Sequence, residues 1–197
     1  IFWTTLSFIL FVVVKVVIFS PFMTVDTTYF TNYVAINYFA WMFISSQLTD
    51  GAHVFITSER WIKGGRMPMT LYVNVSMMRS IVLTLFNFLV IAGMLIYYQV
   101  SLAWTSLWSV IVFLLFIING YSVHYILGVI CTRFRDVSHL IQAILRVMFF
   151  LTPIFWLPDQ MGSLWTKYLI YNPFAHFLIA FREPILSGTM PWDSFMV

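Results

Sequence analysis

Charged side chains are scarce in this sequence, because Asp, Glu, Lys and Arg together make up only 9% of its 197 residues. An ordinary soluble domain carries about a quarter, so the composition excludes a water-soluble globule. Cysteine occurs once, at Cys131, which excludes a scaffold of internal disulfides. Apolar residues instead make up 61% of the chain and aromatic residues 20%, and the mean hydropathy is +0.93. These values predict an all-α integral membrane protein.

Five apolar runs are long enough to cross the hydrocarbon core, which takes about 20 helical residues. Residues 80–132 contain no formal charge, but the polar run 97–101 interrupts them and predicts a helical hairpin. Pro158 and Asp159 are expected to stop the last run. The predicted spans of this single transmembrane domain, residues 1–197, are residues 1–23, 29–49, 71–98, 102–131 and 137–157.

The ten Lys and Arg residues are scattered between apolar runs and make no basic face for nucleic acid. In the predicted topology, the basic residues are distributed unequally between the two sides of the membrane. The connections after the second and fourth spans carry five basic and two acidic residues, whereas the opposite side carries two basic and four acidic ones. Because basic residues concentrate in cytoplasmic loops, residues 51–70 are expected inside and residues 158–192 outside.

The connection formed by residues 51–70 mixes apolar and charged side chains. Gly51 and Ala52 are expected to end the second span, since glycine is common just past a helix end. The spacing of four apolar residues then predicts one face of a short helix: Val54, Phe55, Trp61 and Ile62. Such a helix would lie at the membrane surface with Arg60 and Lys63 towards water. It is either a connector whose charges fix the topology or a docking surface.

Residues 158–192 are too apolar for a free loop. Two helical patterns, separated by a turn at residues 171–173, contain Trp165 with Tyr168 and Phe177 with Phe181. Each pattern is shorter than a span and carries charge. They predict two short re-entrant helices that dip into the outer interface, and the alternative is an aromatic belt at the membrane surface.

Several motifs in these segments resemble those of type-2 ABC export permeases. The fifth-helix region of that family resembles residues 133–137 (RFRDV) with 149–156 (FFLTPIFW). A second family signature is similar to residues 171–176 (YNPFAH), 180–182 (AFR) and 186–188 (LSG). Gly51, residues 61–63 and Pro68 match its cytoplasmic loop less sharply. Within the family, the chain is most similar to permeases that export O-antigen, capsule or teichoic-acid polysaccharides.

The resemblance implies a homodimer of six-helix subunits in the bacterial cytoplasmic membrane, with a pathway for lipid-linked polysaccharide between them. Two separate ATP-binding-cassette subunits, which carry ATP and Mg, would drive it. An N-terminal interface helix and a sixth span are expected outside the sequence given. No nucleotide-binding GxxxxGK[ST] motif is present, so this chain is expected to hold no cofactor and no metal. The resemblance places the ATPase-coupling surface in residues 51–70, and the candidates there are Val54, Phe55, Glu59, Arg60, Trp61 and Lys63.

A pathway for a sugar chain needs flat rings for the apolar faces of sugars, together with polar groups for their hydroxyls. The candidates for lining it are Trp3, Phe8, Phe39, Trp41, Phe43, Arg146, Phe149, Phe155 and Trp156. At any single position, packing or lipid contact is the more common role of an aromatic ring. Arg146 could bind the pyrophosphate of a lipid-linked glycan or make a structural bond across the dimer. The candidates for an external gate are Trp165, Tyr168, Asn172, Pro173, Phe177, Phe181, Arg182 and Glu183.

Other functions remain open from the sequence. A membrane-embedded glycosyltransferase or acyltransferase would handle similar lipids, but it needs catalytic acids or a histidine base at one membrane face. The seven acidic residues are dispersed, and neither H-x4-D nor D-x-D occurs. An ABC exporter of a drug or lipid is a further alternative.

Overall fold

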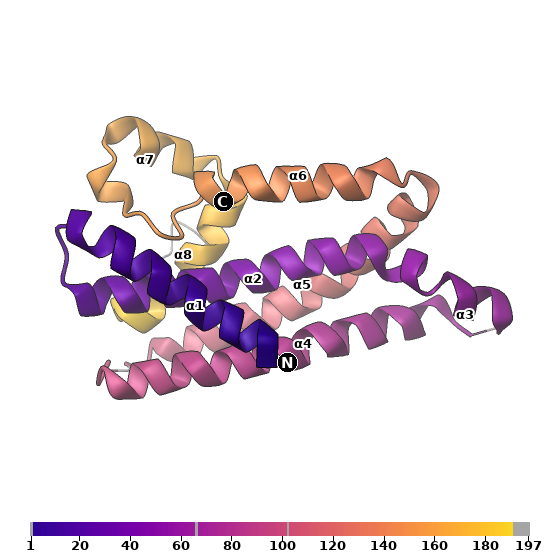
Figure 1. The fold of residues 1–197 in the computed structure, drawn as a ribbon, viewed down its shortest axis with the longest axis horizontal. Helices are drawn as coiled ribbons and strands as arrows, with labels where there is room; N and C mark the ends of the chain where they lie inside the picture. The colour runs from indigo at the N-terminus through magenta and orange to yellow at the C-terminus, as the bar shows by residue number, and fades with distance from the viewer. Residues whose placement is uncertain (1, 66, 102, 191–197) are drawn as a thin grey trace.

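The computed structural model describes residues 2–65, 67–101 and 103–190, and every regular element in these ranges is a helix (Figure 1). The parts of the predicted segments that fall on residues 1, 66, 102 and 191–197 lie outside the described residues. The all-α prediction is confirmed. In chain order the elements are α1 (Phe2–Phe19), η1 (Ser20–Phe22), α2 (Thr27–Thr57), α3 (Glu59–Gly64), α4 (Met69–Tyr97), α5 (Ser106–Arg133), α6 (Asp136–Leu151), η2 (Pro158–Gln160), α7 (Ser163–Ile170) and α8 (Pro173–Leu186).

Helix α2 forms the centre of the bundle, because it packs against α1, α4, α5, α6 and α8. Its start is fixed by Asp26, whose side chain accepts a hydrogen bond from the backbone N–H of Thr28. Large side chains along α2, such as Phe30, Phe39 and Phe43, are buried against the surrounding helices. The same helix buries Asn32, Asn37 and Gln47, which suits a helix surrounded by protein and not by lipid.

Within the described residues, three helical segments are long and apolar enough to cross a membrane by length and composition: Phe2–Phe22, Met69–Tyr97 and Ser106–Arg133. The chain is therefore a multi-pass membrane protein on this criterion. The other two predicted spans correspond to α2 and α6. Helix α2 owes its lower hydropathy to its polar residues, and α6 has 16 residues, which reach about 24 Å at the rise of an α-helix.

The connections gather at two ends of the bundle. Figure 1 shows α3 and the α5–α6 connection at one end, and α7, η1 and the α4–α5 connection at the other. At the first end, a guanidinium nitrogen of Arg135 lies 4.0 Å from a carboxylate oxygen of Glu59. At the second, the amide of Gln160 donates to the hydroxyl of Thr24 over 2.7 Å. The basic connections thus share one end, as the predicted topology requires.

Gly51 does not end the second helix, and that prediction is wrong. Helix α2 continues without a break to Thr57. A Cβ atom at Gly51 would lie 2.9 Å from the Cα atom of His124 in α5. The glycine therefore serves a close approach of two helices, a role that small residues commonly have in membrane bundles.

The fifth span was predicted to continue to residue 157, but α6 ends at Leu151. The reason is Pro153, which disfavours the helical conformation at Thr152 and has no N–H to donate. Residues 152–157 form a bend and are buried. The hydroxyl of Tyr33 lies within 3.1 Å of the carbonyl oxygens of Pro153 and Trp156. Tyr33 thus provides a donor to two carbonyl groups of this irregular backbone.

Candidate functional site

An open hollow of about 420 Å³ lies between α2 and α6. We call it the α2–α6 hollow. Trp41, Ser45 and Thr49 follow one stripe of α2, because residues four apart lie on the same helix face. The residues that line the hollow are Trp41, Ser45, Thr49, Gln142, Leu145, Arg146, Phe149 and Phe150.

Aromatic rings form one side of the α2–α6 hollow, and Phe149 is at their centre. Its ring centroid lies 5.8 Å from that of Trp41 and 5.4 Å from that of Phe150. Behind it, Tyr38 stacks on Phe11 with a centroid separation of 3.7 Å. This packing fixes the orientation of the rings that face the hollow, so the hollow presents rigid aromatic faces.

The polar groups of the α2–α6 hollow are both donors and acceptors. The hydroxyl of Ser45 donates to the carbonyl of Met42 over 3.1 Å, and that of Thr49 to the carbonyl of Ser45 over 2.9 Å. Their hydroxyl protons are therefore used within α2, and their oxygen lone pairs remain available as acceptors. Gln142 and Arg146 bring N–H donors from the opposite helix. A polyhydroxylated molecule could both donate and accept hydrogen bonds here.

Arg146 is exposed in this hollow. Among the described residues no carboxylate forms an ion pair with it, and it makes no hydrogen bond there. It lies ten residues after Asp136, or about 15 Å along α6. The guanidinium is therefore a cation without a protein partner, well inside a helix of a membrane protein.

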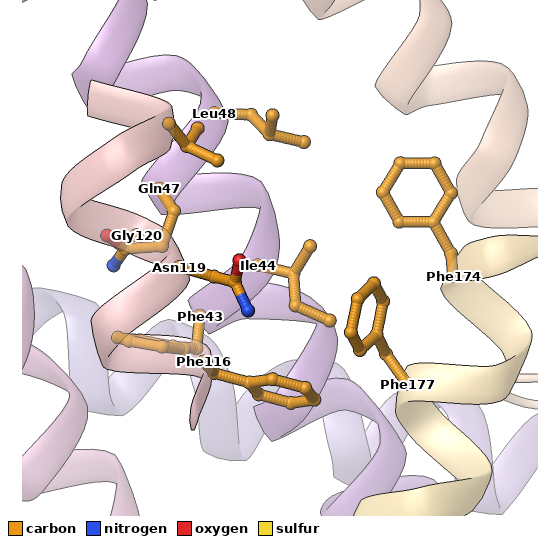
Figure 2. A pocket seen from close by; sticks show the side chains of 10 residues that line it. Phe43, Ile44, Gln47, Leu48, Phe116, Asn119, Gly120, Phe174 and Phe177 are labelled. Atoms are coloured by element: carbon orange, nitrogen blue, oxygen red, sulfur yellow. The ribbon is translucent and has the colours of Figure 1, made fainter. Parts of the chain in front are cut away.

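A second hollow, of about 200 Å³, lies between α2, α5 and the start of α8. We call it the α8 hollow. Figure 2 shows Phe174 and Phe177 of α8 pointing across it towards Ile44 of α2, with Asn119 of α5 beside them. The ring of Phe174 also contacts Trp41, at a centroid distance of 5.6 Å. The tip of α8 therefore lies beside both hollows.

Buried polar contacts hold α7 and α8 in place. The side chain of Asn172 caps α8 by accepting from the backbone N–H of Phe174, and its amide donates to the hydroxyl of Thr152 over 3.1 Å. Arg182 is only 6% exposed; it pairs with Glu183 and lies over the ring of Tyr33 at 4.5 Å. These contacts tie the start of α8 to Thr152 and the later part of α8 to Tyr33 of α2.

The structure brings together only some of the predicted pathway residues. Trp41, Arg146 and Phe149 line the α2–α6 hollow, and Phe43 lines the α8 hollow. Trp3 lies on the exposed side of α1, away from both. The remaining candidates are packed in the core and line neither hollow: Phe8, Phe39, Phe155 and Trp156.

The predicted gate residues fall into two groups. Phe177 faces the α8 hollow, and Pro173 begins α8. The others anchor the two helices. Asn172 and Arg182 do so through the contacts described above, and Glu183 contacts Arg182 and Ser187. Phe181 is buried, and the ring of Trp165 contacts those of Tyr168 and Trp156. Arg182 and Glu183 face each other, although adjacent residues of a helix commonly do not.

The predicted amphipathic helix at the α3 end is shorter than expected. Val54 and Phe55 belong to α2 and are buried against Gly128 of α5, so their predicted place in the same short helix as Trp61 and Ile62 is wrong. Helix α3 contains Glu59, Arg60 and Lys63, and its Trp61 is 76% exposed. A hydrogen bond from Lys63 lowers the pKa of the Glu59 carboxyl.

Sequence reasoning missed five residues of the α2–α6 hollow: Ser45, Thr49, Gln142, Leu145 and Phe150. A signal for the three polar residues was present. Ser45 and Thr49 follow Trp41 at intervals of four, and Gln142 precedes Arg146 by four, which places each set on one helix face. The predicted candidates were aromatic residues and one arginine, and they did not include these uncharged polar neighbours.

Comparison with known proteins identifies the family. A family profile described as "ABC-2 type transporter" matches residues 1–186 of this chain. Two curated relatives, each described as an O-antigen export system permease protein RfbA of Klebsiella pneumoniae, are 24% identical over 194 residues and 22% identical over 192 residues. Each similarity covers 97% of this chain and 74% of the relative. The chain belongs to the ABC-2 type transporter family.

Proposed function

We propose that this chain is the membrane-spanning subunit of an ATP-driven exporter of lipid-linked polysaccharide. The observation that carries the proposal is the α2–α6 hollow, in which aromatic faces lie beside donors and acceptors. Rings of Trp41 and Phe149 suit the apolar faces of sugars, while Ser45, Thr49 and Gln142 suit their hydroxyls. The relatives described as O-antigen export permeases support the same class of cargo.

Two copies of the chain would form the pathway. The α2–α6 hollow is open on the outside of one subunit, and a second copy facing it would close it into a channel. The tips of both α8 helices would then lie at one end of that channel. Since α7 and α8 are too short to cross a membrane, they would line and gate the exit.

The positive-inside rule supports the orientation of the subunit. The end that carries α3 would face the cytoplasm, and the end that carries α7 would face outwards, with α2 and α6 as the second and fifth spans of the inner membrane. Exposed Trp61 and the charges of α3 would then meet two separate ATPase subunits. Those subunits would bind ATP and Mg.

Reconstitution tests the proposal directly. The full-length permease and its cognate ATPase are placed in liposomes that hold lipid-linked polysaccharide in the outer leaflet, with accessible ATPase on the same side. ATP should move the polysaccharide into the lumen, and an ATPase variant without its P-loop lysine should not. ATP-dependent movement of a simple phospholipid or drug, but not of polysaccharide, would contradict the proposed cargo.

A further inference from the structure

The contacts within the described residues do not explain why Arg146 stands in the α2–α6 hollow. A charged side chain at membrane depth is costly, and such residues usually pair with a partner or face water. Within the described residues Arg146 has no carboxylate partner, and its side chain is exposed in the α2–α6 hollow. The guanidinium is therefore free to bind a group from outside this subunit.

Reaching the membrane surface is difficult for this side chain. Side chains of a helix lean towards its N-terminus, which for α6 is Asp136, about 15 Å away. In the other direction α6 ends at Leu151, and the chain enters the buried bend at 152–157. The guanidinium thus remains in the hollow, next to the amide of Gln142 one turn before it.

We propose that Arg146, assisted by Gln142, binds the phosphate of a membrane lipid that enters the α2–α6 hollow. This inference rests on the proposed function and adds to it a recognised group of the cargo. A guanidinium can donate two parallel hydrogen bonds to a phosphate, and the amide of Gln142 adds an N–H donor. The rings of Trp41, Phe149 and Phe150 keep the surroundings apolar, which strengthens a charge-assisted hydrogen bond.

The proposed ligand would use the donors of α6 and the acceptors of α2 for different parts of the same molecule. The phosphate would lie on the α6 side, against Arg146 and Gln142. Attached sugars would lie against the α2 side, where the oxygens of Ser45 and Thr49 accept hydrogen bonds. The hollow would thereby orient the lipid-linked end of the cargo relative to its sugar end.

Native mass spectrometry of the full-length dimer in phosphatidylcholine nanodiscs tests this. The probes are isoprenyl pyrophosphate and the uncharged isoprenol of equal chain length. Wild-type protein should prefer the pyrophosphate at least tenfold. Arg146→Gln should reduce this preference to within about twofold, whereas Arg146→Lys should keep an intermediate preference because it provides one point charge. Arg79→Gln is the matched control, since Arg79 is an exposed arginine of α4 outside the hollow.

Preference is measured on intact dimers only, so a folding or assembly defect does not mimic the result. An unchanged preference in Arg146→Gln would overturn the proposal. This conclusion would hold even if the variant also weakened the dimer by removing a bond between the subunits. Adding phosphatidylglycerol distinguishes the source of the phosphate: displacement of the pyrophosphate identifies an ordinary phospholipid, and its retention identifies the carrier lipid. Because the assay involves neither ATPase nor transport, its failure leaves the result of the reconstitution experiment intact.

Discussion

The hydroxyl of Tyr33 lies 3.0 Å from the carbonyl oxygen of Trp156, which joins the central helix α2 to the bend before α7 and α8. The same hydroxyl is 3.1 Å from the carbonyl oxygen of Pro153. Tyr33→Phe leaves both buried carbonyls without this donor, so it should lower the free energy of unfolding by about 1–3 kcal/mol. Denaturant unfolding of the purified protein in detergent measures this.

Tyr38→Phe is the control for that substitution. The ring of Tyr38 stacks on Phe11, but its hydroxyl makes no hydrogen bond within the described residues, so its loss should change stability by less than about 0.5 kcal/mol. Equal stability of both variants would show that the hydrogen bonds of Tyr33 do not secure the bend.

Close packing of α2 on α5 predicts a second stability effect. Gly51→Ala brings a methyl group to 2.9 Å from the Cα atom of His124, and backbone cannot move aside as a flexible side chain can. The variant should lose about 1–3 kcal/mol. Gly93→Ala in α4 meets nothing within 4 Å and should be neutral or more stable by up to about 1 kcal/mol. The ranking of the two midpoints in denaturant checks the prediction, and a more stable Gly51→Ala contradicts it.

These two sites also mark what the sequence could and could not predict. Apolar run lengths predicted the bundle of long helices, and the charge pattern predicted which connections share an end. Gly51 was misread because a glycine past a helix end and a glycine at a helix crossing look the same without the neighbouring helix. Pro153 was overlooked although it stands in the sequence, since the apolar run continues past it to Pro158.

The candidate site was predictable only in part. Trp41, Phe149 and Arg146 were among the candidates because rings and an intramembrane charge attract notice. Phe8 and Phe155 were chosen on the same basis and are core residues, since residue type alone does not distinguish a packed ring from one facing a hollow. That distinction depends on which helices meet, and only the tertiary structure determines it.

If α3 docks on the ATPase, a substitution on its exposed surface should impair coupled export without lowering the stability of the permease. Trp61 is exposed on α3, so Trp61→Ala should leave unfolding unchanged within about 0.5 kcal/mol. It should lower export per ATP hydrolysed severalfold, because exposed aromatic residues commonly anchor interfaces. Trp104→Ala, at the opposite end and 89% exposed, should leave the ratio unchanged. Normal coupling in Trp61→Ala would count against docking at α3.

If α8 moves during export, a reducible crosslink that holds α8 to α5 should block export reversibly. Asn119 and Phe177 face the α8 hollow from α5 and α8 (Figure 2). In a Cys131→Ala background, cysteines at these two positions joined by a short reducible crosslinker should fix α8 to the bundle. Transport should stop and should return after reduction, while assembly with the ATPase persists. Full transport by the crosslinked protein would mean that α8 does not have to move.

Passage of the cargo over the α2–α6 hollow is the central claim, and photo-crosslinking during export tests it most directly. A photoreactive phenylalanine analogue replaces either Phe150, which lines the hollow, or Leu89, an exposed residue of α4. Export is arrested by trapping the ATPase, and the crosslinked products are probed for polysaccharide. Polysaccharide attached at Phe150 but not at Leu89 is the predicted result. Polysaccharide attached at Leu89 alone, or equally at both positions, would contradict it.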